Sequence, residues 1–157
     1  MPSSNLSIHV PDPLLASLSP FNIMWATLFG EVRGEPIEGQ VGVANVIWTR
    51  AGKNADRLQA VCLAWAQFSC LWPSLDANGF ANVKDFVQTR MGAPERLAPS
   101  ERQLRLIVQG ILGGDLLDNT KGATHYFASY IPTPSWAHAP AEVTARLGKH
   151  IFLKGVA

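Results

Sequence analysis

The sequence lacks any apolar run close to the roughly 18 residues that a membrane-spanning helix needs. Residues 1–18 also lack the basic start and the apolar stretch of a secretory signal peptide. We therefore expect a protein that is synthesised in the cytoplasm without a signal peptide and has no integral membrane segment. If its target lies outside the cytoplasm, another protein must deliver it there.

Charge is also sparse in this chain. Charged residues make up 16% of the sequence, the formal net charge is +1, and no run of Lys or Arg occurs. Proteins that bind nucleic acid usually present a concentrated basic face, so we expect no nucleic-acid partner. The 157 residues, 47% of them hydrophobic, are typical of a globular chain with one core.

Cysteine and histidine are few and scattered. The two cysteines, Cys62 and Cys70, form no CxxC motif, and the four histidines are spread along the chain. We predict no metal and no cofactor. Two interpretations of the cysteines stay open, namely a pair of small buried thiols or a disulfide formed after export.

The residues that are present predict a mainly α (α+β) fold with a small β element. Ser19 and Pro20 are typical of a helix N-terminus, because Ser caps well and Pro fits the first helical position. The expected helices cover residues 19–34, 36–50, 56–66, 80–91 and 100–112, and short β-prone runs at 124–127 and 150–153 can pair as a sheet. We expect an N-terminal arm over 1–18, with little structure before about residue 13, and a single domain over 19–157.

Two of these helices carry more detailed expectations. In the second helix, apolar residues recur at intervals of four, three and four, which predicts one shared face formed by Ile37, Val41, Ala44 and Trp48. In the last helix, Ser100 and Gln103 have the spacing of a capping box, in which each satisfies a backbone donor of the other.

The run from Gly30 to Gln40 concentrates charge between two apolar helices. Glu31 lies near the end of the first helix, against its aromatic residues, and partial desolvation there would raise its pKa toward the range of a general acid. Glu35 and Glu38 lie near the helix N-terminus set by Pro36, where a negative charge is worth about 0.3–1 kcal/mol. The alternative for Glu31 is a cap or an ion pair with Arg33 or Arg50.

Several motifs in a fixed order resemble one family. They are Gly30-Glu31-Val32-Arg33-Gly34-Glu35-Pro36 with Glu38-Gly39-Gln40, then Gln67-Phe68-Ser69, Gly122-Ala123-Thr124-His125-Tyr126, Pro134-Ser135-Trp136-Ala137 and Gly148-Lys149-His150-Ile151-Phe152. Together these motifs resemble the SleB-type cell wall hydrolases, which include spore-cortex-lytic enzymes and phage relatives. The resemblance covers roughly residues 23–154. It departs from the family pattern at Val32, where Ala is usual, and at Phe127, where a second His often follows Tyr.

This resemblance implies a lysozyme-like fold that cleaves the glycan strand of peptidoglycan between N-acetylmuramic acid and N-acetylglucosamine. The family's catalytic acid falls on Glu31. Ordinary glycosidases use two carboxyl groups, but the sequence offers one acid in a convincing apolar setting. We therefore expect a lytic transglycosylase, in which the 6-hydroxyl of muramic acid attacks the anomeric carbon and gives a 1,6-anhydro product.

Candidate substrate-binding groups follow from the same motifs: Gln67, Phe68, Ser69, Thr124, Tyr126 and Trp136. Each has a structural alternative, since Tyr126 and Trp136 can pack in the core and Gln67 and Ser69 can fix their loop. We interpret His125 as structural. Two other functions stay open: a hydrolytic muramidase that uses Glu35, Glu38 or a positioned water, and a non-catalytic glycan-binding or virion structural module.

The predicted biological setting is a phage lysin. A holin-type partner that permeabilises the membrane would let such a protein reach the cell wall, where the peptidoglycan glycan strand is its substrate. We expect a monomer.

Overall fold

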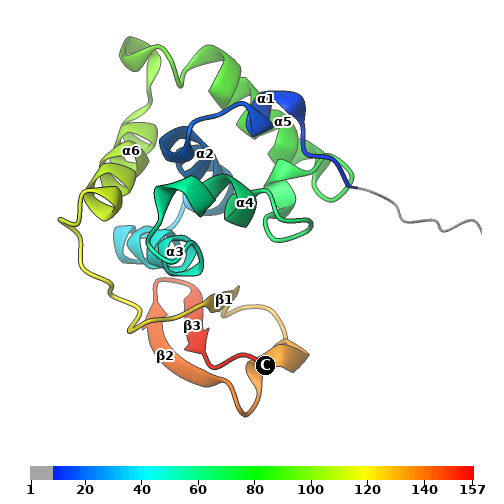
Figure 1. Ribbon diagram of the computed structural model, residues 1–157, viewed down its shortest axis with the longest axis vertical. Coiled ribbons are helices and arrows are strands. Elements are labelled where there is room, and N and C mark those ends of the chain that lie inside the picture. The colour runs from blue at the N-terminus through cyan, green and yellow to red at the C-terminus, as the bar shows by residue number, and fades with distance from the viewer. Residues whose placement is uncertain (1–8) are drawn as a thin grey trace, which may run out of the picture.

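The computed structural model describes residues 9–157 and shows a mainly helical domain with a small sheet at one end (Figure 1). The helices are α1 Pro13–Ala16, α2 Pro20–Val32, α3 Ile37–Arg50, α4 Leu58–Cys62, α5 Ala77–Thr89 and α6 Pro99–Leu112. Short 3-10 turns are η1 Ala55–Arg57, η2 Ser69–Leu71, η3 Pro94–Arg96 and η4 Ser135–Ala137, and the strands are β1 His125–Ala128, β2 Glu142–Leu147 and β3 His150–Lys154. The predicted fold class is confirmed.

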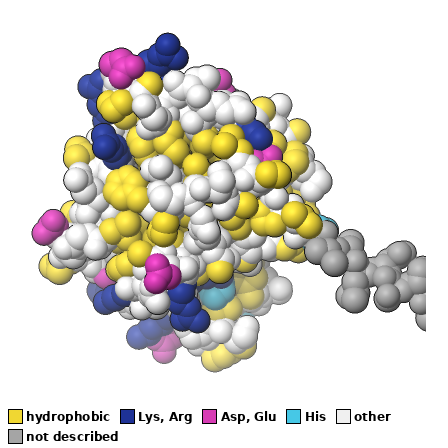
Figure 2. All heavy atoms as spheres, turned by 45° about the horizontal axis from the view of Figure 1, so that its top comes forward, with side chains coloured by type: hydrophobic (Ala, Val, Ile, Leu, Met, Phe, Trp, Pro, Cys, Tyr) yellow, Lys and Arg dark blue, Asp and Glu magenta, His cyan; other side chains and the backbone are white. Residues whose placement is uncertain are grey.

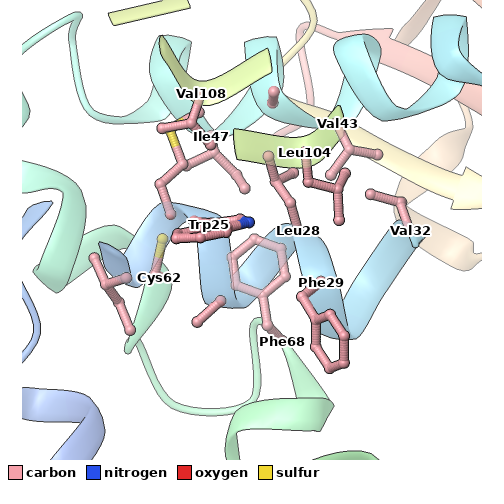
Figure 3. Close-up of a cluster of buried hydrophobic side chains, with 14 of the residues drawn as sticks. Trp25, Leu28, Phe29, Val32, Val43, Ile47, Cys62, Phe68, Leu104 and Val108 are labelled. Carbon is pink, nitrogen blue, oxygen red and sulfur yellow. The ribbon is translucent and has the colours of Figure 1, made fainter. Parts of the chain in front are cut away.

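Helix α2 is the centre of the core. It contacts α3, α4, α5 and α6, so that every residue from Ile23 to Phe29 is buried. Figure 3 shows Trp25 and Leu28 of α2 among side chains from α3, α4 and α6. Its predicted start is confirmed, because the Ser19 hydroxyl accepts a hydrogen bond from the Asn22 N–H at 3.1 Å and Pro20 follows as the first helical residue.

Helix α3 occupies the predicted residues, and its predicted face is partly confirmed: Ala44 is fully buried, and Val41 and Trp48 are half-buried against the core. Ile37 is 52% exposed, whereas Val43, Val46 and Ile47 are fully buried. The helix is covered by α2 and α6 on one side and contacts β1 and β2 on another. Two covered sides bury a wider surface than a single apolar stripe, so the four-three-four pattern identified only part of it.

The predicted capping box at Ser100 and Gln103 is also wrong. Helix α6 begins at Pro99, and the Glu101 carboxylate accepts a hydrogen bond from the Ala98 N–H at 2.9 Å. Arg90, which follows α5, donates through its Nε to both Glu101 oxygens at 3.0 Å. Because this buried carboxylate already satisfies the free backbone donor, the helix begins ahead of Ser100.

The remaining helix predictions differ from the structure mainly in their bounds. The helix expected over 56–66 is shorter, since α4 is preceded by the 3-10 turn η1, and the helix expected over 80–91 begins earlier, at Ala77. Asp76 sets that earlier start, because its carboxylate accepts a hydrogen bond from the Gly79 N–H at 2.9 Å.

The two predicted strands pair as expected, but the sheet contains a further strand. β1 and β3 are antiparallel, with Tyr126 opposite Phe152, and the unpredicted β2 pairs with the other side of β3. The sheet order is therefore β1-β3-β2. A two-residue turn at Gly148 and Lys149 joins β2 to β3, and Gly148 has φ +57°, a value that favours glycine.

Part of the expected N-terminal arm packs on the domain. Leu15 is fully buried, and the Asp12 carboxylate both caps α1 and pairs with Lys84 of α5 at 2.9 Å. Residues 1–8 lie outside the described part of the chain, and the division at residue 18 stays a prediction. Within residues 9–157, no helix is both long and apolar enough to span a membrane.

Charged side chains are dispersed over the surface drawn in Figure 2. On that face the Lys and Arg side chains lie in separate groups with uncharged side chains between them.

A close approach between α3 and the sheet gives a test of this packing. A Cβ added to Gly42 would lie 2.6 Å from Cζ of the fully buried Phe152, whereas a Cβ on Gly39 of the same helix would meet its first neighbour at 3.5 Å. Both changes replace a helical glycine by alanine, so the gain in helix propensity largely cancels and their difference mainly reports the clash. We expect Gly42→Ala to be less stable than Gly39→Ala by about 1–3 kcal/mol in urea denaturation. Equal stabilities would contradict the packing.

Candidate active site

A cavity of about 550 Å³ lies where the helices meet the sheet. Its lining comes from the end of α2, the end of α3, the loop before η2, strand β1, η4 and the C-terminal residues: Glu31, Arg50, Ala66, Gln67, Phe68, Ser69, His125, Tyr126, Trp136, Val156 and Ala157. The fold therefore brings together motifs that are far apart in the sequence. Glu31 is the one acidic side chain among these lining residues.

The Glu31 carboxyl group accepts one hydrogen bond on each oxygen. The Cys70 thiol donates to Oε1 at 3.5 Å, and the Tyr126 hydroxyl donates to Oε2 at 3.3 Å. Burial raises the pKa of Glu31 above 4.5, the two hydrogen bonds oppose this shift, and the charge of Asp76 adds to it. The predicted desolvated acid is thus present at the predicted place.

The structure does not support the ion-pair alternative for Glu31. Within residues 9–157, Glu31 forms no salt bridge. The Arg33 guanidinium donates to the Phe29 carbonyl at 2.9 Å and lies over the Phe29 ring. Arg50 instead lies 3.4 Å from a ring nitrogen of His125.

Tyr126 combines the two roles that the sequence left open. Its ring packs against Phe152 and His150, with centroid distances of 5.9 and 5.3 Å. Burial and the charge of Glu31 raise the pKa of Tyr126 well above 10, so its hydroxyl keeps its proton and remains a donor. A core ring therefore carries a hydroxyl that is satisfied by the candidate acid.

Thr124 was expected to bind substrate and His125 to be structural, but it is His125 that lines the cavity. Thr124 does not line the cavity, and its hydroxyl lies 2.9 Å from Nδ1 of His125, which does. Burial and the charge of Arg50 lower the pKa of His125 below 6.5, so the ring is neutral at neutral pH. The sequence did not predict His125 as a lining residue. Strand alternation alone does not show which of the first side chains of a strand reach a cavity.

The loop from Gln67 to Ser69 lines the cavity as expected. Gln67 and Ser69 are exposed, and neither side chain forms a hydrogen bond within residues 9–157, so both can bond a ligand. Phe68 is 1% exposed and packs among core side chains in Figure 3. Trp136 is half-buried, with its ring 5.3 Å from that of His125.

Glu35 and Glu38 do not line the cavity. Glu38 is exposed in the first turn of α3. Glu35 points toward the β2–β3 turn, where a Cβ on Gly148 would lie 3.8 Å from its Oε2, and its charge opposes the lowering of the His150 pKa by burial. The structure thus separates the three glutamates of the motif.

Both cysteines are free and buried, so no disulfide joins them. Burial raises the pKa of Cys62 to about 12, which makes it an inert core thiol. The contact of Cys70 with Glu31 was not predicted. Within residues 9–157, no group of three or more His, Cys, Asp or Glu side chains is arranged to hold a metal ion.

Comparison with known families and structures gives the same result as the motifs. The sequence model of a family described as Cell Wall Hydrolase matches residues 34–153. The chain belongs to this cell wall hydrolase family. The predicted SleB-type resemblance is therefore confirmed.

Proteins similar to this chain include spore cortex-lytic enzymes. That of Oceanobacillus iheyensis is 28% identical over 94% of this chain and 45% of its own length, and that of Bacillus cereus is 28% identical over 98% and 50%. The chain thus spans about half the length of these relatives.

Two solved structures are also similar to this chain. The catalytic domain of Bacillus cereus SleB has a TM-score of 0.60 and 26% identity over 86% of this chain and 89% of that chain. The catalytic domain of the germination-specific lytic transglycosylase SleB from Bacillus anthracis has a TM-score of 0.60 and 25% identity over 88% and 96%.

Relative to wild type, the Glu31→Gln variant is expected to become more stable as the pH rises. Because burial raises the folded-state pKa above 4.5, the contribution of Glu31 to stability is present below that value and is lost as pH rises through the raised pKa. Gln does not titrate. The free energy of unfolding of Glu31→Gln minus that of wild type should therefore increase between about pH 4 and pH 8 in urea denaturation. A difference that is constant or decreases would contradict burial as the main cause.

Proposed function

We propose that this protein cleaves the glycan strand of peptidoglycan between N-acetylmuramic acid and N-acetylglucosamine as a lytic transglycosylase. The observation that carries the proposal is the single acidic side chain of the cavity, Glu31, whose pKa is raised by burial. A cavity with one acid suits a reaction in which the substrate supplies its own nucleophile.

Glu31 acts first as an acid. Its protonated carboxyl donates the proton to the glycosidic oxygen as the bond between that oxygen and C1 of muramic acid breaks. The leaving N-acetylglucosamine keeps the bond electrons and the proton as its 4-hydroxyl. The muramic acid ring becomes oxocarbenium-like.

Glu31 then acts as a base. Its carboxylate takes the proton of the muramic acid 6-hydroxyl while that oxygen forms a bond with C1, which closes the 1,6-anhydro ring and restores the protonated acid. Cys70 and Tyr126 donate more strongly to the carboxylate than to the neutral acid, so they stabilise Glu31 in the state between the two steps.

The other lining residues bind the substrate. Gln67 and Ser69 present exposed polar side chains that can bond sugar hydroxyl and acetamido groups, and Trp136 presents a half-buried ring on which a sugar can stack. Phe68 forms part of the cavity wall from the core. Thr124 acts through its contact with His125, as a positioning residue.

The similar proteins support this reaction. The Bacillus anthracis domain is described as a lytic transglycosylase, and the curated relatives are described as spore cortex-lytic enzymes. The hydrolytic alternative has less support, because Glu35 and Glu38 lie outside the lining of the cavity. Delivery by a holin-type partner, a phage origin and a monomeric state stay predictions.

The products distinguish transglycosylase from muramidase. Mass spectrometry of muropeptides from sacculi digested by this protein should show 1,6-anhydro-muramic acid ends, which borohydride does not reduce. Reducible muramic acid ends would contradict the transglycosylase proposal and favour the muramidase.

A matched pair of substitutions tests the role of Glu31. Glu31→Gln keeps the shape of the side chain but cannot donate or take up the proton, so the initial rate of sacculus clearing should fall by at least about 100-fold. Glu38→Gln makes the same change at an exposed residue outside the cavity and should leave the rate within about twofold. Wild type and Glu31→Gln that bind sacculi equally without clearing them would identify a binding module instead.

A further inference from the structure

A second cavity of about 450 Å³ opens beside the candidate active site. Its lining comes from the end of α3, from η1, from α4 and from the turn that follows: Arg50, Asp56, Arg57, Ala60, Val61, Ala64 and Gln67. Arg50 and Gln67 line both cavities. A ligand that branches from a glycan strand near Glu31 can therefore enter this side cavity without leaving the protein surface.

The charged groups of the side cavity are two guanidinium groups and one carboxylate. Neither Arg50 nor Arg57 forms an ion pair within residues 9–157. Arg57 is exposed, with its Nη1 over the turn at Gly52, and Arg50 is half-buried beside His125. A guanidinium group recognises a carboxylate with two parallel hydrogen bonds, so this pair is suited to an acidic ligand.

The apolar side chains that line the side cavity are small. Ala60 of α4 and Ala64 after it present methyl groups to the cavity, and Val61 of α4 presents an isopropyl group. Asp56 adds one carboxylate that can accept a hydrogen bond from an ammonium group. The cavity thus combines sites for carboxylates, for small alkyl groups and for one amine.

We propose that the side cavity binds the stem peptide of peptidoglycan. This inference rests on the proposed function, since the stem peptide is attached to the lactyl group of the muramic acid whose bond is cleaved near Glu31. The stem peptide carries free carboxylates, alanine methyl groups and a diamino acid, which match Arg50 and Arg57, the alanines of the cavity, and Asp56 in turn. A neutral sugar of the strand would use neither guanidinium group as a charge partner.

A comparison of two substrates distinguishes binding of the stem peptide from binding of a sugar. Intact sacculi carry stem peptides, and strands stripped with an amidase do not. We expect Arg57→Ala to lower kcat/KM on sacculi about 5- to 10-fold, mainly through KM, because a charge-assisted hydrogen bond is lost. On stripped strands the change should be less than about twofold. Arg57→Lys, which keeps the charge, should recover part of the loss on sacculi.

Arg96→Ala is the matched control, since Arg96 is an exposed arginine of η3 that lines neither cavity. It should change neither rate. A thermal melt of each variant shows that the exposed substitutions leave the fold intact.

The possible results have distinct meanings. An equal loss on both substrates would show that the side cavity holds a sugar, and no loss on either would show that it holds no part of the substrate; both overturn the inference while leaving the proposed function standing. If wild type cleaves neither substrate, the proposed function itself fails. In that case, co-sedimentation with sacculi measures binding without cleavage. The double variant Glu31→Gln with Arg57→Ala should co-sediment less than Glu31→Gln alone, and equal co-sedimentation overturns the inference.

Discussion

The burial of one carboxyl group, that of Glu31, is the constraint on which the rest of the site depends. A charged carboxylate is costly to bury, so the surrounding chain must supply hydrogen-bond donors to its oxygens. Cys70 and Tyr126 supply those donors from η2 and β1. Gly30 permits this arrangement, because a Cβ there would lie 2.4 Å from the Cys70 sulfur.

The fold is arranged to keep these donors in place. The tightly surrounded helix α2 fixes the position of Glu31, and the close approach of Gly42 to Phe152 fixes the sheet against α3. Tyr126 lies directly opposite Phe152 in that sheet. The end of α3 then places Arg50 between the two cavities, which connects the acid with the surface where we propose that the stem peptide binds.

Much of this arrangement could be predicted from the sequence, because some signals are local. Ser19 and Pro20 start α2, and the apolar residues around Glu31 indicated its desolvation. Contacts between distant segments could not be predicted in this way. Cys70 and Tyr126 lie 39 and 95 residues from Glu31 in the chain, and no local pattern links them.

The wrong predictions have the same physical origin. The start of α6 was misplaced because Arg90, which follows α5, holds Glu101. Ile37, the first residue of α3, is 52% exposed although it shares the apolar spacing of Val41, Ala44 and Trp48. Strand β2 was missed because all of its side chains are exposed or half-buried, so it shows little apolar alternation. Tertiary contacts decided these features over local propensity.

The most direct test of the account is the titration of Glu31 itself, followed by carbon-13 NMR of its carboxyl carbon in wild type and identified by its absence in Glu31→Gln. We predict a pKa above 4.5 that coincides with the alkaline limb of the rate of glycan cleavage. A carboxyl group that titrates at or below 4.5, or a cleavage rate that does not follow its titration, would contradict the assignment of Glu31 as the buried acid.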